Sequence, residues 1–140
     1  MTLINKEADY ALRILRGLSD GEMHSIKKIA ESQMIPGQFA YKILQKLRDS
    51  GLVIATRGNG GGCRLNGDLR KVTLFDLMQI VDKKSNVLMQ CYEPGYKCPW
   101  REQHGGCAVH AGLSGVEKEL SAVLKAHTLA EFIPASRRMN

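Results

Sequence analysis

Residues 38–65, QFAYKILQKLRDSGLVIATRGNGGGCRL, decide the expected fold. The first part repeats apolar residues at helical spacing, namely Ala40, Ile43, Leu44 and Leu47. Residues 52–55 then predict a strand, residues 57–62 a glycine-rich hairpin tip, and residues 63–65 the returning strand. A helix followed by such a hairpin is the order expected of a winged helix-turn-helix.

The flanking sequence predicts further helices. An apolar face precedes the quoted stretch, made by Ala8, Ala11, Leu12, Leu15 and Leu18, and residues 19–21 should end that first helix. Ser25 is a suitable cap for a shorter second helix, which leads into a turn at residues 34–37. Thr73 should start another helix, with Asp76 placed as in a capping box. The expected fold class is mainly α with a small β-wing.

The charge of this region favours a nucleic-acid partner. The whole chain carries a formal charge of +6. Residues 38–70 contain two acids, Asp49 and Asp68, against a larger basic set: Lys42, Lys46, Arg48, Arg57, Arg64 and Arg70. Clustered basic residues are typical of proteins that bind a phosphate backbone, although a solvated surface has the same composition.

The outer face of the residue 38–47 helix carries hydrogen-bonding side chains, namely Gln38, Tyr41, Lys42 and Gln45. A helix fits the major groove, where glutamine can bond base edges and lysine can reach phosphates. At the wing, Gly58 and Gly60 let the backbone approach DNA closely, and Arg57 suits the negative potential of a narrow minor groove. Double-stranded DNA is therefore the expected partner.

A second motif follows the wing. Cys91, Cys98, Cys107 and His110 have the spacing C-x6-C-x8-C-x2-H, in a stretch rich in proline and glycine and without apolar periodicity. The sequence has no apolar run that could span a membrane, and its start lacks a secretory signal, so we expect a cytoplasmic protein without a membrane partner. In a reducing compartment, clustered cysteines favour metal or redox chemistry over disulfides.

Several motifs together resemble the IscR/NsrR family of winged-helix transcription regulators. They are DYALR at residues 9–13, LRDSGLV at residues 47–53, RGNGGG at residues 57–62, and the later cysteine loop. The resemblance implies a homodimer that binds a palindromic operator, acting as a repressor. It also implies an iron–sulfur cluster that senses iron–sulfur status, redox or nitric oxide and thereby controls operator binding.

The same resemblance implies residue roles. Gln38, Tyr41 and Lys42 match the base-reading positions of the recognition helix, and Arg57 and Gly60 match the wing positions that enter the minor groove. Tyr41 departs from the acidic residue that IscR has there. The operator sequence therefore does not transfer.

The resemblance assigns Cys91, Cys98 and Cys107 as cluster ligands and leaves two candidates for the fourth. His110 reproduces the IscR spacing and implies a 2Fe-2S cluster, which we favour because this histidine lies beside the third thiolate. Asp9 matches the NsrR aspartate that reaches a 4Fe-4S cluster from the partner subunit. Replacing one soft thiolate by imidazole or carboxylate weakens the hold on the cluster, as a sensor requires.

The cysteine motif has other possible interpretations. A Cys3His zinc site is chemically natural, although the short cysteine pairs of most zinc fingers are absent. A regulator without metal could act through reversible thiol oxidation or a protein partner. An enzyme could use Cys107 as nucleophile and His110 as base, but no nucleotide-binding fingerprint accompanies them. We therefore expect a regulator and not an enzyme.

The last helix is expected near residues 111–126, with Ser114 and Glu117 placed as a start signal. Its apolar stripe is Leu113, Val116, Leu120, Val123 and Leu124, which we expect to pair with the same helix of a second subunit. The predicted organisation is a DNA-binding domain at residues 1–72 and a second region at residues 73–140. That region holds the cluster loop, at about 88–110, the dimerisation helix and a C-terminal tail.

Overall fold

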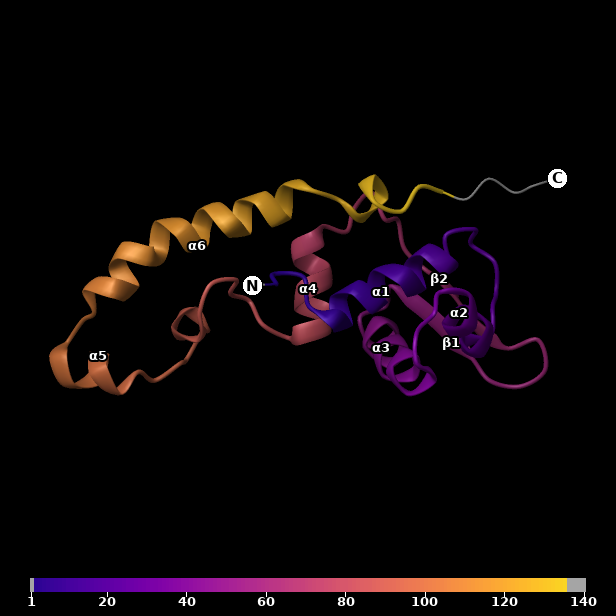
Figure 1. Cartoon of the computed structure of the whole chain (residues 1–140), viewed down its shortest axis with the longest axis horizontal. Coiled ribbons are helices and arrows are strands. Elements are labelled where there is room, and N and C mark those ends of the chain that lie inside the picture. The colour runs from indigo at the N-terminus through magenta and orange to yellow at the C-terminus, as the bar shows by residue number, and fades with distance from the viewer. Residues whose placement is uncertain (1, 136–140) are drawn as a thin grey trace.

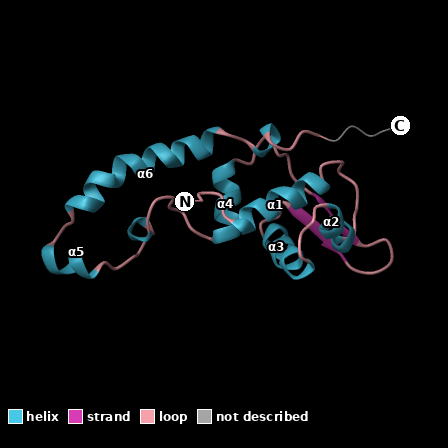
Figure 2. Ribbon diagram, viewed as in Figure 1, coloured by secondary structure: helices cyan, strands magenta, loops and turns pink. Residues whose placement is uncertain are grey.

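The computed structural model describes residues 2–135, so the last part of the expected C-terminal tail lies outside the described residues. The first half comprises α1 (Lys6–Gly17), α2 (Ile26–Ser32), α3 (Gly37–Asp49), β1 (Val53–Thr56) and β2 (Gly62–Leu65). The second half comprises α4 (Leu74–Asp82), η1 (Gln90–Tyr92), α5 (Pro99–His104), α6 (Ala108–Ala126) and η2 (Leu129–Glu131). Figures 1 and 2 show α1, α2, α3 and the hairpin gathered at one end, with α5 and most of α6 at the other.

Side-chain caps fix two of the expected helix starts. The Ser25 side chain accepts the backbone N–H of Lys28, at the start of α2. Thr73 and Asp76 form a complete capping box at the start of α4, each side chain accepting the other residue's backbone N–H. Such caps satisfy N–H groups that have no partner within the helix. Both sequence predictions are confirmed.

The two strands form the expected wing. β1 and β2 pair antiparallel, with Val53 opposite Leu65 and Thr56 opposite Gly62. His24 adds a bridge to Cys63, so the segment before α2 lies alongside the wing. The three helices and this hairpin confirm a winged helix-turn-helix in a mainly α chain.

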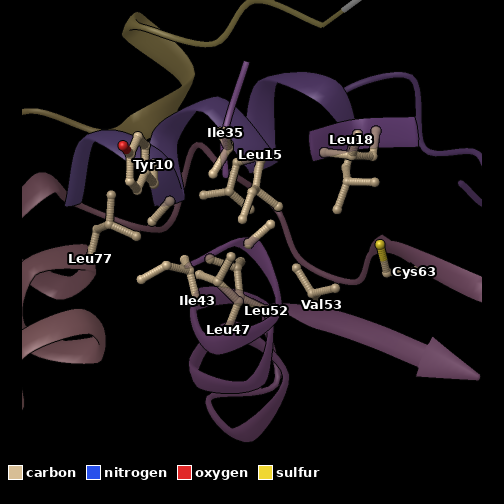
Figure 3. Close-up of a cluster of buried hydrophobic side chains, with 14 of the residues drawn as sticks. Tyr10, Leu15, Leu18, Ile35, Ile43, Leu47, Leu52, Val53, Cys63 and Leu77 are labelled. Atoms are coloured by element: carbon tan, nitrogen blue, oxygen red, sulfur yellow. The ribbon is translucent and has the colours of Figure 1, made fainter. Parts of the chain in front are cut away.

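One hydrophobic core joins the winged helix to α4 and η2. Leu15 of α1, Ile43 and Leu47 of α3, and Val53 of β1 are fully buried (Figure 3). Leu77 of α4 belongs to the same cluster and lies beside Tyr10 in Figure 3. Val81, Leu129 and Ile133 also belong to it. The core thus crosses the expected boundary at residue 72, and the division into two regions stays a prediction about function.

The last long helix begins earlier than the sequence suggested. α6 starts at Ala108, because the sulfur of Cys107 accepts the backbone N–H of His110 and so caps the helix. Ser114 lies inside the helix, where its hydroxyl donates to the carbonyl of Ala111. The expected start near residue 111, with Ser114 as its signal, was therefore wrong.

Cys63, in β2, is fully buried. Its sulfur donates a hydrogen bond to the carbonyl of His24. Burial raises the pKa of the Cys63 thiol, because the charged thiolate loses its solvation. The other three cysteines are partly exposed and free.

The burial of Cys63 predicts a difference in thiol reactivity. In native, metal-free protein, an aromatic disulfide reagent should modify three thiols rapidly and the fourth only on unfolding, because the thiolate is the reactive form. Mass mapping of the late thiol should identify Cys63. Modification of Cys63 at the rate of the others would contradict the prediction.

The backbone conformation of Gly62 leads to a second prediction, about the stability of the fold. Its φ is +145°, and an added Cβ would meet the backbone carbonyl of His24 far inside contact distance. Gly62→Ala should lower the free energy of unfolding by about 1–3 kcal/mol, measured by denaturant titration. Gly37→Ala is the matched control, since a Cβ there meets nothing within 4 Å. Equal stabilities of the two variants would refute this account of the wing.

Candidate functional site

A groove lies between the outer face of α3 and the wing. It encloses about 310 Å³ and is lined by Tyr41, Lys42, Leu44, Gln45, Arg48, Ala55 and Arg57, which we call the recognition groove. Four residues singled out from the sequence, Tyr41, Lys42, Gln45 and Arg57, therefore share one surface. Leu44, expected to face inward, is partly buried against the core and also lines this groove.

The remaining predicted contact residues flank the groove. Gln38 is exposed in the first turn of α3 and does not line the groove. Gly58 and Gly60 are exposed at the wing tip with φ values of +97° and +75°. These values lie in the region that favours glycine, so the tight tip depends on them. The carbonyl of Gly58 accepts the N–H of Gly61 and closes the turn.

An acidic residue outside α3 forms ion pairs with two lysines of α3. The Glu7 carboxylate at the start of α1 binds Lys42 Nζ at 2.7 Å and Lys46 Nζ at 2.6 Å. The hydrogen bond from Lys42, and then that from Lys46, lowers the pKa of Glu7 below its ordinary value. Lys46 also donates to the carbonyl of Val81 in α4 at 2.7 Å.

Sequence reasoning did not assign Arg48 or Glu7 to this site. Arg48 follows Gln45 by three positions, so the helical period places them on one face and could have identified it. Glu7 is thirty-five residues from Lys42 along the chain. Nothing in the sequence pairs the two, because only the packing of α1 against α3 brings them together.

Two thiols and the histidine of the cysteine motif meet where η1 faces the first turn of α6. His110 Nδ1 lies 3.3 Å from the Cys91 sulfur, and the His110 backbone nitrogen lies 3.5 Å from the Cys107 sulfur. The ring of Tyr92 stacks on the His110 ring with centroids 4.4 Å apart. Loss of solvation, reinforced by the neighbouring Cys91, raises the pKa of the Tyr92 hydroxyl.

Cys98 is the residue before α5. It lines a shallow hollow with Tyr96, Lys97 and Arg101 and has no hydrogen bond to the other cysteines within the described chain. No three histidine, cysteine or acidic side chains in residues 2–135 are grouped to hold a metal ion, and this includes Cys91, Cys107 and His110. The donor types fit a soft metal or an iron–sulfur cluster, but the ligands would have to move closer together to hold one.

Asp9, the alternative fourth ligand, lies on α1. Its carboxylate pairs with Arg13 of the same helix at 2.8 Å. It is half-exposed and borders a pocket with Thr2 and Ile4. Among residues 2–135, Asp9 is not grouped with the cysteines as a metal site.

The stripe predicted for α6 is mostly uncovered. Leu124 is buried, while Leu113 and Leu120 are half-buried. Val116 and Val123 are 43% and 56% exposed. Within the described residues, none of the helices has the length and apolar character needed to cross a membrane.

Comparison with known proteins agrees with this architecture. Residues 4–135 match the model of the Rrf2 family, described as iron-dependent transcriptional regulators. The chain is 31% identical over 140 residues to protein aau3 of Rhizobium meliloti, covering 98% of this chain and 88% of that protein. It is 30% identical over 136 residues to the HTH-type transcriptional repressor NsrR of Streptomyces coelicolor, covering 94% and 88% respectively.

Solved structures share the fold at lower identity. T. potens IscR superposes with a TM-score of 0.64 at 20% identity, covering 97% of this chain and 90% of the other. CymR of B. subtilis, the global cysteine regulator, superposes with a TM-score of 0.68 at 20% identity, covering 98% of this chain and 100% of the other. The winged helix followed by a long helix is thus a known arrangement, and the family match extends over nearly the whole chain. The chain therefore belongs to the Rrf2 family and is a transcription regulator, not an enzyme.

Proposed function

We propose that the protein is a homodimeric repressor that binds a palindromic DNA operator under the control of an iron–sulfur cluster. The observation that carries the DNA-binding part is the recognition groove. Tyr41, Lys42 and Gln45 from α3 share it with Arg57 from the wing. The chemistry of the cysteine motif and the family carry the sensory part.

The groove residues divide into base readers and backbone contacts. Gln45 and Gln38, both exposed, can bond base edges, while Lys42 and Arg48 can neutralise phosphates. The wing carries Arg57 beside the glycine tip, where Gly58 and Gly60 leave room for a close approach to the minor groove. A helix and an adjoining wing can thus hold one half-site.

The uncovered stripe of α6 supports a dimer. Burial of apolar area stabilises association, and Leu113, Val116, Leu120 and Val123 offer a continuous apolar face that one chain leaves open. A two-fold axis through that helix would present two recognition helices to the two halves of a palindrome.

Cys91, Cys98 and Cys107 are the proposed thiolate ligands. His110 is the preferred fourth ligand, for a 2Fe-2S cluster, since its ring already lies against Cys91 and its backbone against Cys107. Asp9 from a partner subunit remains the alternative, for a 4Fe-4S cluster. When bound, a cluster of this kind supplies ligand bonds that oxidants, nitric oxide or loss of iron can break.

Polar contacts join α1 and the recognition helix to the end of α4, which precedes the cysteine segment, residues 88–110. The segment follows the end of α4, where Asp82 accepts two hydrogen bonds from the amide of Asn5, at 2.9 and 3.1 Å. At the same end, the carbonyl of Val81 accepts a hydrogen bond from the ammonium group of Lys46 in α3. A rearrangement of the segment that moves the end of α4 would therefore act on α1 and α3. Any such change requires different affinities of DNA for the two arrangements.

The arrangement of the thiols favours one alternative function. Because no three donor side chains in residues 2–135 are grouped to hold a metal, the protein could bind no cluster and instead respond through thiol oxidation or a protein partner. A structural zinc site of three cysteines and His110 would require the same convergence as the cluster. Anaerobic purification followed by iron, acid-labile sulfide and zinc assays separates these alternatives. Iron with sulfide supports the proposal, whereas zinc without sulfide, or no metal at all, contradicts it.

Two variants should separate sensing from DNA binding. Cys98→Ala should lose iron and sulfide and change operator affinity, because a cluster ligand is missing. Arg57→Ala should keep the metal and weaken binding by roughly tenfold, with the salt slope falling by about 0.9, because one phosphate or minor-groove contact is lost. Fluorescence anisotropy with a duplex selected from a random pool measures both.

Arg70→Ala is the control for Arg57→Ala, since Arg70 is paired with Asp68 and does not line the groove. If Arg57→Ala and Arg70→Ala weaken operator binding equally, the recognition groove is not the DNA interface. Retention of full iron and sulfide by Cys98→Ala would remove Cys98 from the ligand set.

The dimer makes a separate prediction. Val123→Glu should yield monomers with weakened operator binding, because a charge cannot be buried unpaired in an apolar interface. Ala122→Glu is the matched control, since Ala122 is exposed and projects to the opposite side of α6. Analytical ultracentrifugation measures the assembly. A Val123→Glu protein that sediments as the wild type does would show that α6 is not the interface.

A further inference from the structure

Lys42 and Lys46 share the Glu7 carboxylate but differ in their other surroundings. The Lys46 side chain is 23% exposed and has a second acceptor in the Val81 carbonyl. The Lys42 side chain is 55% exposed and lines the recognition groove. Within the described residues, Glu7 is the one group that Lys42 binds.

We propose that Glu7 is an internal competitor of DNA, which occupies Lys42 in the free protein and is exchanged for a phosphate when DNA binds. The inference rests on the proposed function in taking Lys42 as a DNA contact. It adds that a residue outside the recognition helix sets the affinity for duplex DNA of any sequence, and so contributes to specificity.

The exchange is feasible because neither partner is left without a counter-charge. When Lys42 moves to a phosphate, Glu7 keeps its 2.6 Å ion pair with Lys46. Lys46 in turn keeps its bond to the Val81 carbonyl. An exposed ion pair contributes little in water, so the Lys42–Glu7 pair is a modest barrier and not a lock.

The electrostatics of Glu7 agree with this role. Its carboxylate is charged at neutral pH, and its pKa is lowered, first by the hydrogen bond from Lys42, because the bound lysine stabilises that charge. A charged carboxylate beside the groove also opposes the approach of phosphates, whereas the charged groups that line the groove, Lys42, Arg48 and Arg57, attract them. Operator binding can offset this cost through base contacts, but binding to random sequence has no such contacts.

The test is a double-mutant cycle on DNA of random sequence. Glu7→Gln in the full-length dimer should bind a short random-sequence duplex about two- to fivefold more tightly than the wild type, as expected for loss of one exposed ion pair. Lys42→Gln should bind more weakly and lower the salt slope by about 0.9. In the Lys42→Gln background, Glu7→Gln should tighten binding less than it does in the wild type, because only the direct repulsion between Glu7 and the phosphates is left to remove.

Controls distinguish competition from a general charge effect. Glu31→Gln removes the same charge from an exposed position on α2 that forms no ion pair with the groove. It should leave affinity unchanged. Thermal unfolding of each variant checks the fold, and Glu7→Ala repeats the comparison if Glu7→Gln is unstable.

The outcomes separate the two levels of inference. Unchanged affinity of Glu7→Gln, or the same tightening with and without Lys42, would overturn the competitor role while leaving the DNA interface intact. A Lys42→Gln protein with wild-type affinity and salt slope would instead show that Lys42 does not contact DNA. That result would contradict both the proposed DNA contact of Lys42 and the competitor role of Glu7.

Discussion

The packing of α4 against α1 and α3 is the constraint on which the rest of the structure depends. Leu77 and Val81 of α4 are almost completely buried in the core that also holds the recognition helix. Burying each such side chain contributes about 1.5–3 kcal/mol, so α4 cannot leave without unfolding much of that core. Because α4 also packs against α6, it fixes the relation between the groove at one end and the cysteine segment at the other.

Directional polar contacts refine that apolar packing at a single place, the junction of α1, α3 and the end of α4. Asn5 holds Asp82, while Lys46 joins Glu7 to the Val81 carbonyl. Apolar packing tolerates small sliding, but short charge-assisted hydrogen bonds do not. The orientation of the recognition helix is thereby tied to the end of α4, a few residues before the cysteine segment.

The cysteine segment is well held at its two ends and weakly held between them. The Glu117 carboxylate of α6 accepts the backbone N–H groups of Val87 and Leu88, at 2.7 and 2.6 Å. Cys107 caps α6 at the other end. Residues 93–106 contain no buried residue and include Cys98. A bound metal or cluster would add order where the chain supplies least of its own, since ligand binding contributes to folding free energy.

Local signals determined much of this protein from sequence. Helical periodicity, the caps at Ser25 and Thr73, and the glycines of the wing each depend on neighbours a few residues apart, so the winged helix-turn-helix followed without tertiary information. The outer face of α3 and the spacing of the cysteines were equally visible. Ser114 misled because a hydroxyl can cap a helix or bond within one, and the thiol of Cys107 had already capped it.

Only the tertiary structure decided which distant residues meet. Glu7 with Lys42, Asn5 with Asp82, and the passage of the core beyond residue 72 arise from packing between helices far apart in sequence. The proximity of His110 to Cys91 depends on how η1 lies against the start of α6. Periodicity specifies which face of a helix is apolar, but it does not specify which charged group from another helix will lie beside it.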